Sequence, residues 1–368
     1  MAVYQGKSTV VWIEALKNRD PGARTSAIDA LVKIGMAAVP DLVDALSDDN
    51  LEIVTGAAQA LARVGPLARA ALPALQAAMK HRVTSVRAEA AFALARVSSD
   101  ALTKSLQSGD PLVRASAVEA LGRLGNEVKD RTKTLVAALQ DPDTLVRDAA
   151  VQTLGRLGNA ALEAVPTLIA MARSAEMDAK ASIFLALGAI GPAALEAVPI
   201  LVDSLEVEGL RSASARALAG IGPAAKPAVP KLKPMLADPN LRYIAAGAMV
   251  SIGAEASATV PVLIEGLADA RVRDACLEFL GRVGWAARPA VGPLCALLKH
   301  DDVTTRALTA RALGLIGPAA KPAMGALRKL TRSDNEEVKA AAIEALERIN
   351  PKARLGSGSF LDKVLRRA

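Results

Sequence analysis

The stretch DPLVRASAVEALGRLG, residues 110–125, holds the pattern that decides the fold of this chain. It begins with Asp-Pro, continues with apolar residues at helical spacing and ends in Gly125. An Asp before the first turn, a Pro inside it and a Gly after the last turn are typical start and stop signals of an α-helix. The stretch also holds two arginines, Arg114 and Arg123, and a single copy cannot say whether they serve packing or binding.

The pattern recurs along the whole chain, with 27 to 33 residues between consecutive copies. Four residues before the terminal Gly, at position −4, ten copies have Leu and one has Met249. Position −1 is a large aliphatic residue in every copy, and both positions fall on one face of an α-helix, which we name helix B. The copies end at Gly35, Gly65, Ser98, Gly125, Gly158, Gly191, Gly222, Gly253, Gly284, Gly317 and Asn350.

A second apolar helix, helix A, precedes each helix B. Its copies include AVPDLVDAL, AVPTLIAMA, AVPILVDSL, AVPKLKPML and TVPVLIEGL, which share a Pro near the start. Short turns, often Asp-Pro, connect A to B, and their Asp suits a helix N-cap. Eleven helix pairs of this kind predict an all-α solenoid over residues 1–350, in which each pair buries its apolar face against its neighbours.

The combined pattern DPxxVRxxAxxALGxxG, followed by GPAAxxAVPxLxxxL, resembles the bacterial HEAT repeat of the phycobilisome-lyase-like subgroup over roughly residues 8–350. This resemblance implies a right-handed superhelix whose B helices line the concave surface. It also implies that an Asp/Arg ladder cross-links adjacent repeats. Fold alone does not give function, because HEAT arrays serve many roles.

Comparison among the repeats separates the two arginines. Arg114 lies at position −11, where ten of the eleven copies are basic, and a column repeated in nearly every layer indicates packing. Arg123 lies at position −2, where the first five copies are basic and the later ones vary. We name these five residues the basic row and interpret them as a binding surface, with a solvated charge row that includes Glu89 and Glu119 as the alternative. The basic row is Lys33, Arg63, Arg96, Arg123 and Arg156.

Apolar residues on the same side of helix B extend the candidate surface. Position −6 follows no rule and includes Phe92 and Leu185, and Tyr243 and Ile244 lie farther along. We expect these residues to contact the same partner as the basic row. The favoured ligand is an acidic peptide or protein surface, because five cations one repeat apart would create a positive potential.

Composition limits the remaining function classes. Hydrophobic residues make up 52% of the chain and aromatic residues 2%, so Ala and Leu carry the apolar content. The net charge is +7, of which residues 351–368 contribute five cations minus one anion, or +4. The first 350 residues therefore carry only +3, which does not favour nucleic-acid binding, although the basic row keeps it as the alternative. No leader or run of about 18 apolar residues was identified, so we expect a cytoplasmic protein without a membrane span.

The sequence offers little for catalysis. His81 and His300 stand alone in A–B turns, without the His-Glu pairs that would resemble a HEAT-type iron hydroxylase. Cys276 occupies a small core position, and no base is apparent for Cys295. We therefore expect no enzyme activity, no metal and no cofactor. An auxiliary subunit of an enzyme such as a lyase, suggested by the subgroup's name, is the third function considered.

The end of the chain departs from the repeat. Residues 351–359 predict a flexible linker, and 360–368 a short amphipathic helix that needs something to dock on. It either caps the last repeat, docks on another protein or is a disordered end. Its apolar face would be Phe360, Leu361, Val364 and Leu365. Taken together, the sequence predicts a non-catalytic interaction scaffold that is a monomer or a weak oligomer.

Overall fold

The computed structural model describes residues 3–124 and 130–351. Its only strands form a hairpin ahead of the first helix, with β1 (Val3–Tyr4) antiparallel to β2 (Lys7–Ser8). The hairpin is tied to the helix behind it because the indole Nε1 of Trp12 donates to the carbonyl of Tyr4 at 3.2 Å. The sequence analysis did not predict these strands.

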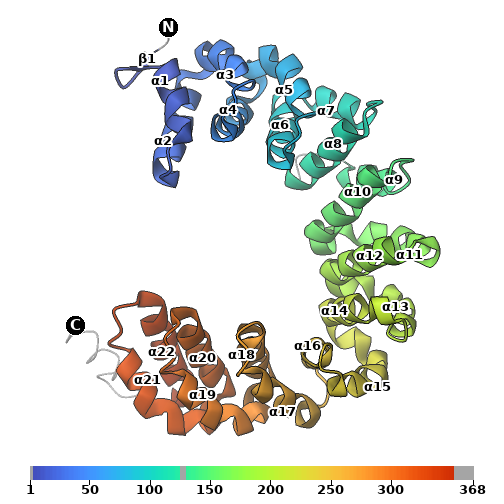
Figure 1. Ribbon diagram of the computed structural model, residues 1–368, viewed down its shortest axis with the longest axis vertical. Coiled ribbons are helices and arrows are strands. Elements are labelled where there is room, and N and C mark those ends of the chain that lie inside the picture. Colours follow the sequence, from blue (N-terminus) through green and yellow to red (C-terminus); the bar gives the residue numbers. More distant parts are fainter. Residues whose placement is uncertain (1–2, 125–129, 352–368) are drawn as a thin grey trace. The chain divides into compact units, whose positions relative to one another are not determined.

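The described residues form eleven pairs of α-helices, as the repeat count predicted (Figure 1). The A helices are α1 (Thr9–Glu14), α3 (Val39–Ala45), α5 (Leu72–Ala78), α7 (Ser99–Leu106), α9 (Arg131–Ala138), α11 (Val165–Ser174), α13 (Val198–Ser204), α15 (Val229–Leu232), α17 (Ala256–Gly266), α19 (Val291–Leu297) and α21 (Met324–Leu330). The B helices are α2 (Pro21–Ile34), α4 (Leu51–Val64), α6 (Thr84–Val97), α8 (Pro111–Arg123), α10 (Thr144–Leu157), α12 (Met177–Ile190), α14 (Arg211–Ile221), α16 (Arg242–Ile252), α18 (Arg273–Val283), α20 (Val303–Ile316) and α22 (Glu336–Ile349).

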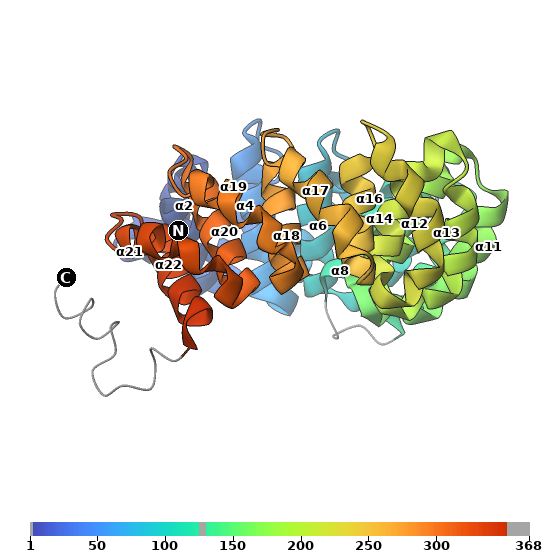
Figure 2. The ribbon, with the colours of Figure 1, turned by 90° about the horizontal axis from the view of Figure 1, so that it is seen from below.

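The chain divides into two compact units, Met1–Ala186 and Leu187–Ala368. Within each unit the B helices lie side by side in one layer and the A helices in a second layer (Figures 1 and 2). Contacts run between consecutive B helices, such as α4 with α6 and α20 with α22. Each repeat therefore depends on its immediate neighbours, which is the organisation of a solenoid. That residues 1–350 form one continuous domain stays a prediction.

The glycine anchors end the B helices as predicted. Ten of the eleven anchors lie in the described residues, and eight of these are glycines whose φ lies between 56° at Gly158 and 84° at Gly191. This left-handed region is open to Gly at little cost, so the chain can leave the helix there. In six repeats a seven-residue 3₁₀ segment then leads into helix A: η3 (Gly65–Ala71), η5 (Gly158–Ala164), η6 (Gly191–Ala197), η8 (Gly222–Ala228), η10 (Gly284–Ala290) and η11 (Gly317–Ala323).

Polar side chains begin the B helices, but not always the predicted ones. The side chains of Asp20 and Asp110 accept backbone N–H bonds in the first turn of α2 and α8, as expected. In the fifth repeat the N-cap is Asp143, which directly follows the pair Asp141-Pro142. In the eighth repeat Asp238 instead accepts from the backbone N–H of Asn240, and α16 begins only at residue 242. An Asp-Pro pair therefore marks the turn but does not fix the first residue of the helix.

The leucines of position −4 form the centre of the core. The ten from Leu31 to Leu313, with Met249 among them, are at most 1% exposed. Leu346, in the last described repeat, is only partly buried, because α22 is the last of the described B helices and has a B-helix neighbour among them on one side alone. Burying each leucine contributes about 1.5–3 kcal/mol, and truncation to Ala in such a core costs about 2–5 kcal/mol.

Two B helices of the second unit touch through their main chains. A Cβ added to Gly220 in α14 would lie 2.1 Å from the carbonyl oxygen of Gly188. Gly220 occupies position −2, the same position as the basic row. A basic residue is therefore excluded at this repeat by packing, which is one cause of the interruption of the column besides ligand binding.

One helical stretch of the described residues, Met177–Ser204, is long and apolar enough to cross a membrane by length and composition. The sequence analysis overlooked it. The stretch comprises α12, η6 and α13, and half of it is buried in the protein. The chain turns at Gly191, where φ is +84°, so these residues form two helices of a packed hairpin.

We expect Gly220→Ala to destabilise the protein, because the added methyl group overlaps backbone that no side-chain rotation can move aside. Overpacking of this kind costs about 1–3 kcal/mol. Gly325→Ala in α21 is the matched control, since nothing lies within 4 Å of a Cβ at that position. Chemical denaturation measures both, and equal stability of the two variants would contradict the close helix approach.

Candidate protein-binding surface

The structure places all five residues of the basic row near the carboxyl ends of consecutive B helices in the first unit. They lie on α2, α4, α6, α8 and α10, and every one of these side chains is exposed. Their neighbours at position −4 are buried, so helix packing does not require the charges. The side chains predicted to share a surface are therefore in the same register of one helical layer.

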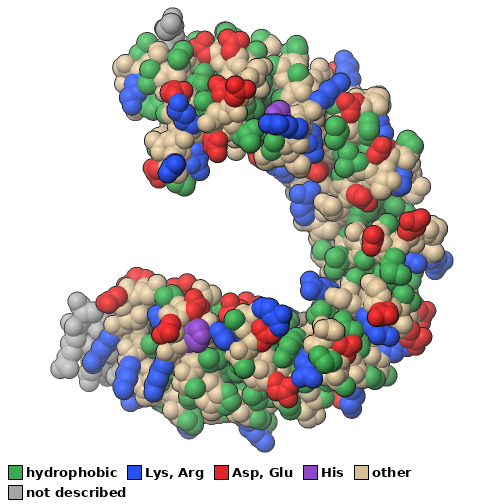
Figure 3. Space-filling model, viewed as in Figure 1, with side chains coloured by type: hydrophobic (Ala, Val, Ile, Leu, Met, Phe, Trp, Pro, Cys, Tyr) green, Lys and Arg blue, Asp and Glu red, His purple; other side chains and the backbone are tan. Residues whose placement is uncertain are grey.

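Acidic residues of preceding repeats pair with part of the basic row. Arg63 Nη1 lies 2.6 Å from Asp29 Oδ1, and Arg123 Nη2 lies 3.1 Å from Glu89 Oε1. Both partners sit one repeat earlier in the chain. On the face shown in Figure 3, basic and acidic side chains are accordingly interspersed over the first unit. The row is a set of exposed cations with acidic neighbours and not an uninterrupted positive strip.

Arg123 is held more firmly than its exposure suggests. Its guanidinium carbon lies 4.3 Å from the centre of the Phe92 ring, and its Nη1 donates to the carbonyl of Ala88 at 3.2 Å. A guanidinium over an aromatic face gains a cation–π contribution of about 0.5–1 kcal/mol at an exposed site. The predicted surface residues Phe92 and Arg123 thus come together, with the charge positioned before any ligand arrives.

The structure separates the apolar residues predicted for this surface. Leu185 is 47% exposed on α12 and belongs to the first unit. Tyr243 and Ile244 are partly buried on α16 of the second unit, and the Tyr243 ring packs beside Gly266. Tyr243 therefore serves packing at least in part. A single partner that contacts all of these residues stays a prediction. The four residues predicted for the docking tail, Phe360, Leu361, Val364 and Leu365, lie outside the described residues.

The arginines of position −11 hold the A–B turns. Each of six donates to the carbonyl five or six residues earlier, where helix A has just ended. Basic side chains satisfy otherwise unpaired carbonyls at helix ends in this way. In four of these repeats the Asp at the start of helix B, namely Asp20, Asp110, Asp143 or Asp302, accepts backbone N–H bonds of that helix, so its role there is capping. The six are Arg24, Arg87, Arg114, Arg147, Arg273 and Arg306.

Arg114 also makes a bidentate contact with the next repeat. Its Nε and Nη2 lie 2.9 and 2.8 Å from the two carboxylate oxygens of Asp141, and both side chains are about 14% and 13% exposed. The hydrogen bonds from Arg114 lower the pKa of Asp141, and those to Asp141 raise the pKa of Arg114. This pair is one point where the predicted cross-link between repeats is present.

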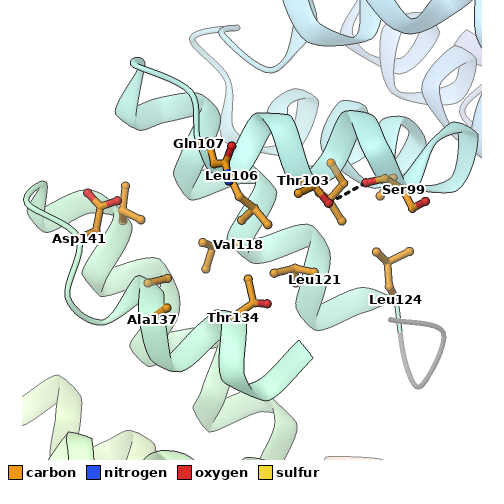
Figure 4. Close-up of a pocket in the computed structure, with 14 residues that line it drawn as sticks. Ser99, Thr103, Leu106, Gln107, Val118, Leu121, Leu124, Thr134, Ala137 and Asp141 are labelled. Atoms are coloured by element: carbon orange, nitrogen blue, oxygen red, sulfur yellow. Dashed lines mark hydrogen bonds between the residues drawn. The ribbon is translucent and has the colours of Figure 1, made fainter. Parts of the chain in front are cut away.

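A pocket of about 600 Å³ opens in the first unit between α7, α8, α9 and α10 (Figure 4). Its floor includes the buried Leu121 and Val118, and Thr103 and Gln107 lie at its rim. The pocket follows from the short fourth repeat, because Ser98 both ends α6 and caps α7 and no seven-residue turn separates the two helices. The 27-residue spacing between Ser98 and Gly125 was the sequence signal for this short repeat and its pocket, and the sequence analysis did not use it.

Groups with chemical reactivity are few among residues 3–124 and 130–351. No cluster of three or more His, Cys, Asp or Glu side chains in these ranges could hold a metal ion. Cys276 is 1% exposed, and burial raises the pKa of its thiol to about 11. At neutral pH this thiol stays protonated, so it is a poor nucleophile and packs as a small apolar residue.

The family of HEAT repeats matches the chain at residues 9–95, 72–132, 99–188, 132–219 and 291–362. These matches cover residues 9–219 and 291–362, well over half of the sequence. The chain belongs to the HEAT-repeat family. No curated protein matches its sequence significantly.

Solved structures show the same HEAT fold at low sequence identity. Yeast importin-β is 15% identical, with a TM-score of 0.61 over 98% of this chain and 59% of that one. Kap121p bound to Pho4p is 15% identical, with a TM-score of 0.50 over 95% of this chain and 46% of that one. An engineered protein is 25% identical, with a TM-score of 0.45 over 94% of this chain and 99% of that one. The chain thus spans about half of each karyopherin.

We expect Asp141→Asn to destabilise this HEAT-repeat protein by about 1–3 kcal/mol, since it removes a partly buried charged hydrogen-bond pair. Because the folded pKa of Asp141 is depressed, its contribution is present above about pH 4 and lost as the pH falls through the folded pKa. Asp29→Asn, which removes the exposed partner of Arg63, should cost at most about 1 kcal/mol.

Urea denaturation between pH 2 and pH 7 tests both substitutions. The stability difference between wild type and Asp141→Asn should shrink at the acid end of this range. A difference that is the same at every pH, or an equal loss in the two variants, would show that the Arg114–Asp141 charge pair does not stabilise the interface between repeats.

Proposed function

We propose that this protein is a non-catalytic scaffold that binds a partner protein or an acidic peptide along the B helices of the first unit. The observation that carries the proposal is the basic row, five exposed cations in one register of consecutive helices. Within it, Arg123 rests on Phe92 and presents its guanidinium in a fixed position. An arginine over an aromatic ring is a frequent energetic centre of protein interfaces.

The charge balance of this surface indicates how a ligand would be recognised. The same helices carry five acidic residues, Asp29, Glu52, Glu89, Glu119 and Asp148, so the five cations of the basic row are matched by five anions, and the arginines of position −11 are counted separately. Exposed ion pairs contribute only about 0–1 kcal/mol, so a ligand carboxylate can replace Asp29 or Glu89 at small cost. The basic row therefore favours a ligand whose carboxylates each contact one of its cations. It does not favour a ligand that is attracted by net charge alone.

The structural neighbours support a protein partner by analogy of fold. One neighbour is Kap121p bound to Pho4p, and another is Kap95p in a complex concerned with RanGDP, which aligns with a TM-score of 0.51 and 15% identity. These partners belong to those proteins. What they contribute here is that a solenoid of this kind can bind other proteins without catalytic residues.

Three finer features rest on the sequence pattern. We propose a bacterial protein, a relationship to the phycobilisome-lyase-like subgroup and a cytoplasmic location, each supported by the repeat pattern or by the composition. An auxiliary role in a lyase would rest on the subgroup's name, and no geometry among the described residues favours it over scaffolding.

The triple substitution Arg63→Glu, Arg96→Glu and Arg123→Glu should abolish partner binding while helicity stays unchanged. The measurement is affinity capture from an extract of the source cells, quantified by mass spectrometry. We expect at least about a tenfold loss of the captured partner, as for removal of a central arginine contact. The matched control reverses three exposed charges on the A-helix side of the same unit, Arg69, Lys104 and Arg173, and should retain the partner.

Two results would count against the proposal. Equal capture by wild type and the triple variant would remove the basic row from the binding surface. Capture that depends on nucleic acid, is lost after nuclease treatment and falls steeply with salt would instead support the nucleic-acid alternative.

A further inference from the structure

An exposed tryptophan stands on the second unit, far along the chain from the basic row. Trp285 is 62% exposed in η10, one residue after the glycine that ends α18. Five other repeats have Pro at the equivalent position, and all five prolines are exposed. Packing therefore makes no demand there, and the chain has only two tryptophans. A large aromatic side chain with no packing role points to a contact with another molecule.

Cations surround this tryptophan. The Arg288 guanidinium carbon lies 4.5 Å from the centre of the Trp285 ring, and Arg282, one turn earlier, lies 5.8 Å from the Phe279 ring. The neighbouring segment η11 contacts η10 and contributes the exposed Lys321. Residues 279–290 and 315–323 contain no Asp or Glu, and the exposed Glu278 lies directly before the first of these ranges. On α22, Glu344 pairs with Arg348 and Glu337 pairs with Arg311.

A second exposed apolar residue borders the same area. Leu315 on α20 is 46% exposed, and its Cδ1 would lie 2.9 Å from a Cβ on Gly281. Its carbonyl would lie 3.7 Å from a Cβ on Gly284, the residue before Trp285. Leu315 also lines a pocket of about 220 Å³ between α20 and α22. We name Trp285, Leu315, Arg282, Arg288 and Lys321 the Trp285 patch.

We propose that the Trp285 patch is a second interaction surface, which binds an acidic segment of a partner protein that carries an apolar side chain beside its carboxylates. The apolar side chain would contact Trp285 and Leu315, and the carboxylates would accept hydrogen bonds from Arg282 and Arg288. Tryptophan and arginine are the residues most enriched at energetic centres of interfaces. Guanidinium groups also bind carboxylates in a two-point geometry that ammonium groups cannot match.

Charge favours an acidic occupant over the chain's own terminal residues. Residues 352–368 carry Lys352, Arg354, Lys363, Arg366 and Arg367 against Asp362, a net charge of +4. The patch itself carries three cations and no anion, so the two would repel each other. An acidic ligand is therefore complementary where the chain's own terminal residues are not.

Selection of random 12-residue peptides on the full chain, with counter-selection on Trp285→Ala, tests the proposal. Enriched peptides should contain Asp or Glu next to an apolar residue. Titration of such a peptide should shift the fluorescence of Trp285 to shorter wavelength, measured as the difference between wild type and Trp285→Phe. Trp12 is only 8% exposed and supplies a constant background in both proteins.

Charge reversal separates this surface from the basic row. Arg282→Glu with Arg288→Glu should weaken the selected peptides at least about tenfold. The triple substitution of Arg63, Arg96 and Arg123 should leave their affinity unchanged, and so should deletion of residues 355–368. Loss of binding in the triple variant alone would place the ligand on the first unit and overturn this inference while supporting the proposed function.

Other outcomes would also overturn the proposal. These are the recovery of no peptide, peptides without an acidic excess, or equal binding to wild type and Trp285→Ala. Vesicles of phosphatidylserine and phosphatidylcholine provide the remaining comparison. If the chain binds these vesicles through Trp285 and selects no peptide, the patch contacts membranes and the assignment to a protein partner is wrong.

Discussion

Burial of one leucine per repeat against the next repeat is the contact on which this structure depends. A single helix pair cannot cover its own apolar face, so the leucine of position −4 is sealed only when another B helix follows. The ten residues that have such a neighbour are at most 1% exposed, whereas Leu346 is only partly covered. Positive-φ glycines after the B helices and arginines over the A–B turns repeat because each layer must present the same face to the next.

This requirement leaves the other side of most B helices free to vary, and the close main-chain approach at Gly220 is an exception. Position −2 is adjacent in sequence to buried positions, yet its side chains in the first five repeats are exposed. The basic row and the Trp285 patch both lie at positions where packing does not select the side chain and where the residue present is an exposed cation or an exposed tryptophan. In a repeat protein, comparison of the repeats with one another thus shows which residues packing alone selects at each position.

The sequence predicted the eleven helix pairs, the glycine ends and the leucine core because these features recur with the period of the fold. Features confined to one repeat were harder to predict. The main-chain contact between Gly188 and Gly220 depends on the approach of two helices and leaves no periodic signal, so the sequence did not show why Gly occupies position −2 in this repeat. The partners of Arg63 and Arg123 lie one repeat away, and only coordinates could select Asp29 and Glu89. The sequence shows that Trp285 stands where other repeats have Pro, but it does not show that the tryptophan side chain is exposed.

The short fourth repeat shows how such a chain accommodates a change in length. In six repeats a segment of seven residues connects helix B to the next helix A, whereas here Ser98 alone ends α6 and starts α7. The following B helices nevertheless keep their leucines buried, and the lost residues are replaced by a hollow between α7 and α9. The packing of consecutive B helices sets the register of the repeats. Deletions and insertions in the connecting segments therefore alter the layer of A helices only locally. Relatives of this protein can therefore differ in the length of these connecting segments while the layer of B helices keeps its packing.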